Sequence, residues 1–432
     1  MRANALCALA AACGCAALAW LGLIGFVWGD YEIEALPAVN ELVSGHLLEF
    51  LRLAPTYGGS LIERAPFALA PSLWGGGELA VYRMLALPCL LATAALGIYL
   101  VDRMRAQGRS RLARAVTLGV CVANPVALRA LELGHSEELL DAVLCVAAVL
   151  IAASPSAGRR RALLAGVVLG LAIADKESAL IAVGPVLAAL PARRRLLGLG
   201  GTIASAGAIV GPLLLAPGGA FLASARGVAS TNAEIFQPWQ LWWFFGHHGA
   251  VVRGLFGAHK PGYRIGPAWA ATISHPLVVG TGAALALALL VRAHRSERRG
   301  GGPLPARQAL LALALVMLAR CVFDTWDVSY YMLPFLFALL AWELLARPDA
   351  PPLLALLCTV LAWASFPGLP PYATPDVQAA VFLAWTLPLG AWLGMRLLRE
   401  RIPPHASAGA VSAPEPAQEI TVRALERPVR TS

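Results

Sequence analysis

Hydrophobic residues fill long runs along the chain, and short polar segments separate these runs. About twelve runs can be laid out, most of them near the length of about twenty residues that crosses a hydrocarbon core. They cover residues 5–28, 79–101, 115–131, 139–153, 162–174, 179–190, 196–217, 269–291, 309–323, 328–346, 353–366 and 379–398. Several are shorter than a full span, and the pair at 162–174 and 179–190 fits a half-membrane hairpin. The pattern predicts an all-α fold, a polytopic transmembrane helix bundle with about 12 membrane segments, some of them short.

Composition agrees with a membrane protein, because 58% of the residues are hydrophobic and only 14% are charged. The first run is too long and uninterrupted for the apolar region of a cleavable signal peptide, so we expect a retained span. The eight cysteines all fall inside apolar runs, which favours packing as small hydrophobes over disulfides or a metal site. The net charge of +9 does not indicate nucleic acid, since the basic residues lie in short loops between the runs.

The polar segments alternate between two kinds. Segments after the second, fourth, sixth and eighth runs are rich in arginine, and the others are acidic or mixed. This alternation is the positive-inside pattern, which predicts a multi-pass plasma-membrane protein with both termini in the cytoplasm and the acidic segments outside. The transmembrane domain is expected to span residues 1–398. The tail at 399–432 is rich in Pro, Ala, Glu and Arg and predicts a disordered cytoplasmic extension.

The two largest loops, 29–78 and 218–268, are both predicted to lie outside. A stripe in the first loop has helical spacing, with Pro37 in a first turn, and predicts an interfacial helix. The stripe consists of Leu36, Val39, Val43, Leu47 and Leu51. Aromatic residues in the second loop suit the headgroup belt of a membrane. They are Trp239, Trp242, Trp243, Phe244 and Phe245.

Two carboxylates with one residue between them, Asp30 and Glu32, directly follow the first run. Partial desolvation at the edge of the hydrocarbon raises the basicity of such a carboxylate and lets it accept a proton from a hydroxyl. Alternatively, Asp30 caps the N-terminus of the interfacial helix. The spacing leaves both interpretations open.

Two short outer links carry further polar residues. The link between the third and fourth runs holds His135 and Glu137, and His135 suits either a hydrogen bond to a phosphate or sugar hydroxyl, or a structural role. The link at 175–178 holds Lys176, a rare lysine in an arginine-rich chain. Lys176 is a candidate for phosphate contact as a compact charge, and an ion pair with Asp175 or Glu177 is the alternative.

The ninth and tenth runs meet at a link that combines charge with aromatic rings. Arg320 lies inside an apolar run, where an unpaired charge is unfavourable, so it needs a partner or a ligand. Aromatic rings beside carboxylates are typical of sugar sites, and a structural pair between Arg320 and Asp324 is the alternative. The candidate sugar-binding residues of this link are Asp324, Trp326, Asp327 and Tyr330.

Other chemistries lack their motifs: the sequence has no GxxxxGK[ST], no HExxH and no GxSxG. His247, His248 and His259 are loosely spaced and lack a carboxylate at ligand spacing, so they indicate a metal site only weakly. The sequence therefore predicts no metal and no other cofactor.

Five stretches resemble the GT-C superfamily of integral-membrane glycosyltransferases, more narrowly the actinobacterial polyprenol-phosphate-mannose-dependent mannosyltransferases (glycosyltransferase family 87-like). The resemblance covers the body from about residue 5 to 398, and the tail lies outside it. The stretches are GDYEIEALPAV (29–39), APTYGGSLIERAP (54–66), LELGHSEELL (131–140), GLAIADKESALIAVGP (170–185) and RCVFDTWDVSYYMLPFLFALLAWE (320–343).

The resemblance implies an inverting transfer of a hexose, with mannose as the family-level expectation, from a polyprenyl-phosphate donor on the outer face. It makes Asp30 the catalytic base and implies a glycan or glycolipid acceptor, with membrane lipids as further partners. Lys176 matches the family pattern, whereas Glu177 stands where an amide or aromatic residue is expected. A secondary transporter or flippase is the alternative function, and a non-catalytic membrane scaffold is a third.

Overall fold

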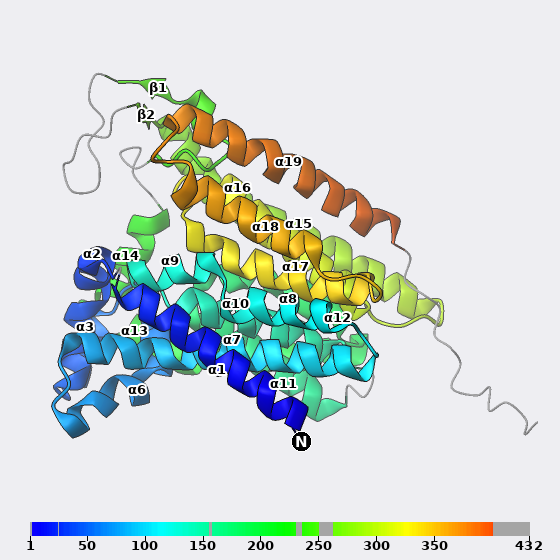
Figure 1. The fold of residues 1–432 in the computed structure, drawn as a ribbon, viewed down its shortest axis with the longest axis horizontal. Helices are drawn as coiled ribbons and strands as arrows, with labels where there is room; N and C mark the ends of the chain where they lie inside the picture. Colours follow the sequence, from blue (N-terminus) through cyan, green and yellow to red (C-terminus); the bar gives the residue numbers. More distant parts are fainter. Residues whose placement is uncertain (1, 25, 155–157, 230–235, 250–261, 401–432) are drawn as a thin grey trace, which may run out of the picture.

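The computed structural model describes residues 2–24, 26–154, 158–229, 236–249 and 262–400. Long helices pack side by side in one bundle (Figure 1). Within the described ranges, eight helical stretches are long and apolar enough to cross a membrane. They are α1 (Arg2–Ile24), α7 (Glu78–Ala106), α8 with α9 (Arg111–Val122 and Pro125–Leu133), α13 (Ala192–Leu215), α15 (Ala268–Arg298), α16 (Ala306–Phe323), η5 with α17 (Ser329–Met332 and Leu333–Ala346) and α19 (Pro375–Arg399). The structure is therefore the predicted all-α bundle of apolar helices.

The remaining predicted runs are also helical, but shorter. They form α10 (Glu137–Ala152), α11 (Arg159–Asp175), η3 with α12 (Glu177–Ala182 and Val183–Ala189) and α18 with η6 (Leu353–Trp363 and Ala364–Gly368). The predicted run at 115–131 is broken between α8 and α9. Asn124 accepts a hydrogen bond from the amide of Val126 at 2.9 Å, and Pro125 occupies the first helical position. Asparagine caps and first-turn prolines start a new helix, which explains the break.

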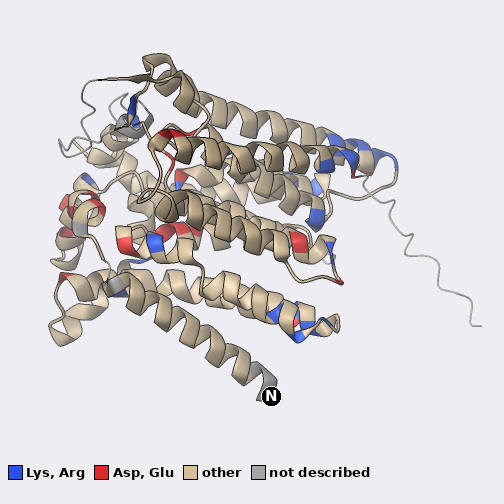
Figure 2. Cartoon of the chain, turned by 45° about the horizontal axis from the view of Figure 1, so that its top comes forward, with Lys and Arg blue, Asp and Glu red and all other residues tan. Residues whose placement is uncertain are grey.

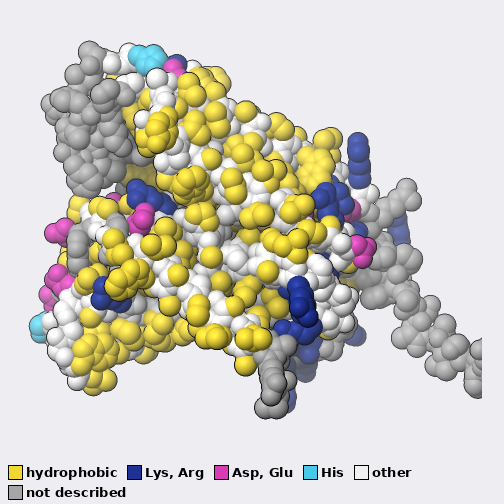
Figure 3. Space-filling model, in the orientation of Figure 1, with side chains coloured by type: hydrophobic (Ala, Val, Ile, Leu, Met, Phe, Trp, Pro, Cys, Tyr) yellow, Lys and Arg dark blue, Asp and Glu magenta, His cyan; other side chains and the backbone are white. Residues whose placement is uncertain are grey.

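The arginine-rich loops lie together at one end of the bundle (right in Figure 2). The first helix begins at this end and α19 finishes there (Figure 1). Hydrophobic side chains cover most of the face between the two ends in Figure 3. The bundle thus has an apolar belt and an arginine-rich end, as a membrane-embedded helix bundle requires.

The first large loop folds into short helices. They are α2 (Trp28–Asp30), η1 (Tyr31–Ala35), α3 (Leu36–Val43), α4 (Leu47–Leu53), α5 (Gly58–Glu63), α6 (Ala65–Leu69) and η2 (Ala70–Trp74). The predicted single interfacial helix is two helices, because Gly45 takes a φ of +81° between α3 and α4. Val39 in α3 is buried, whereas Leu47 in α4 is 62% exposed. The predicted stripe is therefore not one face, since a glycine in the left-handed region ends α3.

The second large loop contains α14 (Ala220–Ala229), η4 (Trp243–Phe245) and a two-stranded antiparallel sheet, β1 (His247–His248) and β2 (Arg264–Ile265). Trp239 donates to the carbonyl of Ser365 at 2.9 Å, and Trp242 donates to that of Phe323 at 2.8 Å. These two tryptophans are buried, whereas Phe244 and Phe245 are exposed. The tryptophans hold the loop on the ends of η6 and α16, so only the two phenylalanines suit a headgroup belt.

Glycines allow helix α11 to approach its neighbours closely. A Cβ atom at Gly166 would overlap the carbonyl oxygen of Gly198 in α13. A Cβ atom at Gly59 of α5 would overlap the carbonyl oxygen of Ala174 at the end of α11. Small residues at crossings of apolar helices let backbones touch. The end of α11 is thereby held against the first large loop.

Candidate functional site

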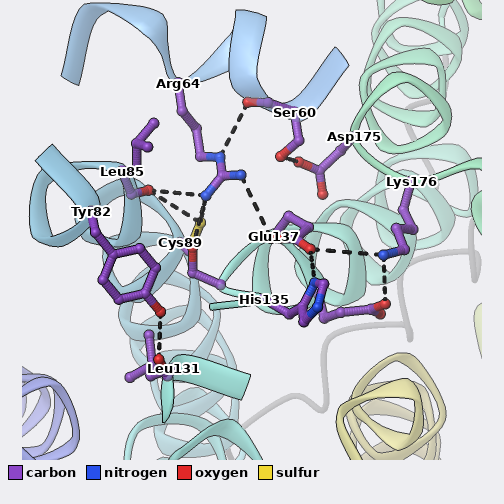
Figure 4. A network of polar contacts seen from close by, with 12 residues as sticks. Ser60, Arg64, Tyr82, Leu85, Cys89, Leu131, His135, Glu137, Asp175 and Lys176 are labelled. Carbon is purple, nitrogen blue, oxygen red and sulfur yellow. Dashed lines mark hydrogen bonds and ion pairs between the residues drawn. The ribbon is translucent and has the colours of Figure 1, made fainter. Parts of the chain in front are cut away.

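Charged side chains gather inside the bundle at the end opposite the arginine-rich loops, where α10 begins and α11 and α16 end (Figures 2 and 4). Each is almost completely buried, with an exposure of 6% or less. Buried charges need partners, so their contacts define the site. We name the group the buried ionic cluster; it consists of Arg64, His135, Glu137, Glu138, Lys176 and Arg320.

Glu137, the first residue of α10, joins three of the cationic groups. Its Oε1 lies 2.8 Å from Nδ1 of His135 and 3.7 Å from Nζ of Lys176. Its Oε2 lies 3.7 Å from a terminal nitrogen of Arg64. One carboxylate therefore brings His135 and Lys176, which belong to different links of the chain, to the same oxygen (Figure 4).

Glu138 extends the cluster towards α16. Its Oε1 lies 3.2 Å from Nζ of Lys176 and 3.8 Å from a terminal nitrogen of Arg320. The Arg320 guanidinium also lies 4.0 Å from the ring centre of Tyr331. The ion pairs that the sequence offered as structural alternatives do not form. Lys176 contacts Glu137 and Glu138 rather than Asp175 or Glu177. Arg320 contacts Glu138 rather than Asp324.

Arg64 was not predicted as a site residue, because it lies in the turn between the short loop helices α5 and α6, with no distinctive local motif. Its side chain donates to Oγ of Ser136 at 2.7 Å and to the carbonyls of Leu85 and Ser60. The hydroxyl of Ser60 in turn donates to Asp175 at the end of α11. Arg64 thus ties the first large loop to the start of α10.

Asp30 lies at the edge of the buried ionic cluster. Its Oδ2 is 3.6 Å from Nε2 of His135, and its side chain remains 37% exposed. Asp30 makes no side-chain capping hydrogen bond to η1, the helical segment that follows it. Its geometry therefore matches a carboxylate that faces solvent or a ligand. It does not match the alternative interpretation, in which Asp30 caps a helix.

His135 has a carboxylate near each ring nitrogen, so both nitrogens act as donors only if the ring is protonated. Burial lowers the pKa of His135, but the Glu137 charge and hydrogen bonds to Asp30 and Glu137 outweigh it and raise the pKa to about 9. The ring stacks on Tyr330 with centroids 4.6 Å apart. His135 is therefore a fixed imidazolium at neutral pH.

Lys176 is also held in its charged form. Burial lowers the pKa of the ammonium group, but the carboxylates of Glu138 and Glu137 raise it well above its ordinary value. The ammonium lies 5.1 Å from the ring centre of Tyr57. The cluster thus presents permanent positive charge directly behind the exposed carboxylate of Asp30.

No protein-family model matches the chain, and neither a curated protein nor a solved structure matches it. The resemblance drawn from the sequence therefore remains an expectation. The function has to follow from the chemistry of the residues that the structure brings together.

The other predicted residues are more scattered. Glu32 is exposed, and within the described ranges no ion pair joins it to the cluster. Asp324 accepts a hydrogen bond from the amide of Trp326 at 3.0 Å and lies 4.0 Å from Nε2 of His275. Burial, together with the charge of Asp324, raises the pKa of Asp327 well above its ordinary value. Tyr330 reaches the site through its stacking on His135.

Two acids that the sequence did not indicate as site residues, Asp141 and Asp175, are fully buried near the cluster. Asp141 lies one turn along α10 from Glu137 and accepts a weak hydrogen bond from the thiol of Cys145 at 3.4 Å. Asp175 accepts from Ser60. In the sequence, each of these acids stands at one end of an apolar run. That position predicts a place near the membrane surface, but it does not predict which residue the acid contacts.

The structure offers no grouping suited to a metal among the residues that it describes. His247 and His248 are exposed on β1, and Nε2 of His248 lies 3.5 Å from Asp376 at the start of α19. His259 lies outside the described residues. The site that can be built therefore contains carboxylates, an imidazolium, an ammonium and guanidinium groups.

Proposed function

We propose that the protein is an inverting membrane glycosyltransferase that moves a hexose from a polyprenyl-phosphate donor to an acceptor hydroxyl, with Asp30 as general base. One observation carries the proposal: Asp30, 37% exposed, lies 3.6 Å from a buried imidazolium. A carboxylate that substrate can reach is placed against fixed positive charge. General-base catalysis next to an anionic leaving group needs this combination.

Asp30 takes the proton of the acceptor hydroxyl as its oxygen attacks the anomeric carbon of the donor sugar. The bond between that carbon and the phosphate oxygen breaks on the opposite face, so the configuration inverts. The lipid phosphate leaves with its electron pair and negative charge, which protonated His135 and Lys176 would stabilise without a metal.

The location of the site supports a lipid-linked donor. The buried ionic cluster lies at helix ends, so a donor held in the bilayer by its polyprenyl chain would present its sugar at this depth. If the arginine-rich end faces the cytoplasm, as the positive-inside pattern predicts, both termini are cytoplasmic and the site is on the outer face. A glycan or glycolipid of the cell envelope would then be the acceptor, and mannose is the expected sugar.

A secondary transporter or flippase is the second candidate. The fully buried Asp141 and Asp175 favour it, because ionisable groups inside membrane helices often mark ion paths. The exposed carboxylate of Asp30 against the cluster favours the enzyme instead. The two candidates differ in their product: only the enzyme makes a new glycosidic bond.

The direct test uses the full chain in nanodiscs with a short-chain polyprenyl-phosphate carrying radiolabelled mannose or glucose, and alkyl glycosides as acceptors. The expected result is a labelled glycoside whose anomeric configuration is opposite to that of the donor. Movement of intact donor between leaflets of proteoliposomes, with no new glycoside, would support the flippase instead. A product with retained configuration would exclude the proposed role of Asp30.

A further inference from the structure

A cavity lies at the arginine-rich end of the bundle, where α16 begins and α19 ends. Its volume is about 390 Å³. Three of its six lining residues are arginines, and one is an acid. The lining consists of Arg307, Trp392, Met395, Arg396, Arg399 and Glu400.

The charges of this cavity favour an anion. Glu400 contacts two of the arginines through their Nε atoms, at 3.2 Å for Arg307 and 3.6 Å for Arg396. One carboxylate thus contacts two of the three guanidinium groups, and the terminal nitrogens of a guanidinium suit phosphate oxygens. The helix α16 begins at Ala306, so its positive N-terminal end lies at the same cavity. The cavity carries an excess of positive charge.

The same helical turn of α19 exposes apolar side chains. Met395 is 48% exposed and Leu398 is 82% exposed, each next in sequence to an arginine of the cavity. The guanidinium of Arg396 lies 5.3 Å and 5.4 Å from the ring centres of Trp342 and Trp392. Anion-binding groups beside exposed apolar side chains and indole rings match the boundary between headgroups and acyl chains.

We propose that this cavity binds the headgroup of an anionic phospholipid, with its acyl chains along the exposed side chains of Met395 and Leu398. A free phosphate would satisfy the arginines but would leave the apolar surface unused. The site is independent of the proposed transfer reaction, since it lies at the opposite end of the bundle from Asp30 (Figures 1 and 2). Each proposal can therefore fail without the other.

The test measures lipid binding to the detergent-solubilised full chain by native mass spectrometry. Phosphatidylglycerol, phosphatidylcholine and glycerol 3-phosphate are the three probes. Wild type is expected to bind phosphatidylglycerol at least tenfold more tightly than the other two. Removal of both Arg307 and Arg399 by R307Q and R399Q should weaken this binding about 25-fold, at about fivefold per arginine.

Two further variants serve as controls. Arg160→Gln removes an exposed arginine at the start of α11, at the same end of the bundle, and should leave binding unchanged. Arg396→Lys keeps the charge next to the indole rings and should retain most of the affinity. Equal binding of phosphatidylcholine, tight binding of glycerol 3-phosphate alone, or an equal loss in Arg160→Gln would each overturn the proposal.

Discussion

Nε2 of His135 lies 3.6 Å from Oδ2 of Asp30, and this contact joins the buried ionic cluster to the carboxylate that is half exposed at its edge. The other ring nitrogen lies 2.8 Å from Glu137. His135 therefore connects a carboxylate that stays inside the protein with one that can reach a ligand. Removing the proton of this histidine would leave only one ring nitrogen able to donate, so one of the two connections would be lost.

Stability is expected to fall as the pH rises through about 9. The pKa of His135 is raised from 6.5 to about 9 in the folded chain, against the effect of burial, by Glu137 and Asp30. The folded state thus holds this proton more tightly than the unfolded state. The stabilisation is complete below pH 6.5 and is lost as the pH passes about 9, with a size of about 3 kcal/mol at most. Unfolding curves between pH 6 and 10 measure this change in the free energy of unfolding. His135→Gln should make the free energy of unfolding less dependent on pH. The same dependence on pH in wild type and variant would contradict this role of His135.

Glu137→Gln should destabilise the fold by about 3 kcal/mol or more, because it leaves His135, Lys176 and Arg64 without their shared carboxylate. Equilibrium unfolding in mixed micelles gives the difference. The matched control is Glu132→Gln in the same link, which removes only a partly exposed pair with Arg129 and should change stability within about 0.5 kcal/mol. Similar effects of the two variants would mean that Glu137 does not organise the cluster.

Glu138 and Arg320 are expected to be energetically coupled. Their side chains approach within 3.8 Å and both are buried, so Glu138→Gln removes the carboxylate that Arg320 contacts, and Arg320→Met leaves Glu138 with Lys176 alone. Glu138→Gln and Arg320→Met should each destabilise by about 2–4 kcal/mol, and the double variant by clearly less than their sum. A double-mutant cycle on unfolding free energies tests this. Additive effects would show that Arg320 is stabilised mainly by Tyr331.

The close approach of α5 to α11 predicts a packing effect near the site. Gly59→Ala would force the backbone of α5 away from the carbonyl of Ala174 and pull Ser60 from Asp175. A loss of about 2 kcal/mol or more is expected from overpacking. Gly200→Ala on an open face of α13 is the control and should be neutral or slightly stabilising. Equal melting temperatures for the two variants would argue against a rigid contact.

The sequence predicted the apolar helices and the gathering of polar residues at their ends, because length and hydrophobicity alone decide what can span a bilayer. It also gave His135, Glu137, Lys176 and Arg320 as candidate site residues on separate links, and the structure brings these four side chains together. The pairing was not predictable from neighbours along the chain. Lys176 has an extended backbone, with φ −150° and ψ +126°, between the end of α11 and the start of η3, and its ammonium reaches Glu137 and Glu138 on α10.

The contacts of Arg64 could not be predicted from the sequence. Its hydroxyl partner Ser136 is 72 residues away, and the contact depends on how the first large loop packs over α7 and α10. The prediction of one continuous interfacial helix across Gly45 failed for a different reason, because this glycine was visible in the sequence. The hydrophobic spacing continued across it and outweighed the turn signal.

Substitution of Asp30 tests whether this residue removes the proton of the acceptor hydroxyl. Initial rates of sugar transfer from a polyprenyl-phosphate donor should fall at least about 100-fold in Asp30→Asn, with donor affinity little changed. Glu32→Gln, two residues along and exposed, should retain nearly full activity. Transfer at the wild-type rate by Asp30→Asn would rule out Asp30 as the general base.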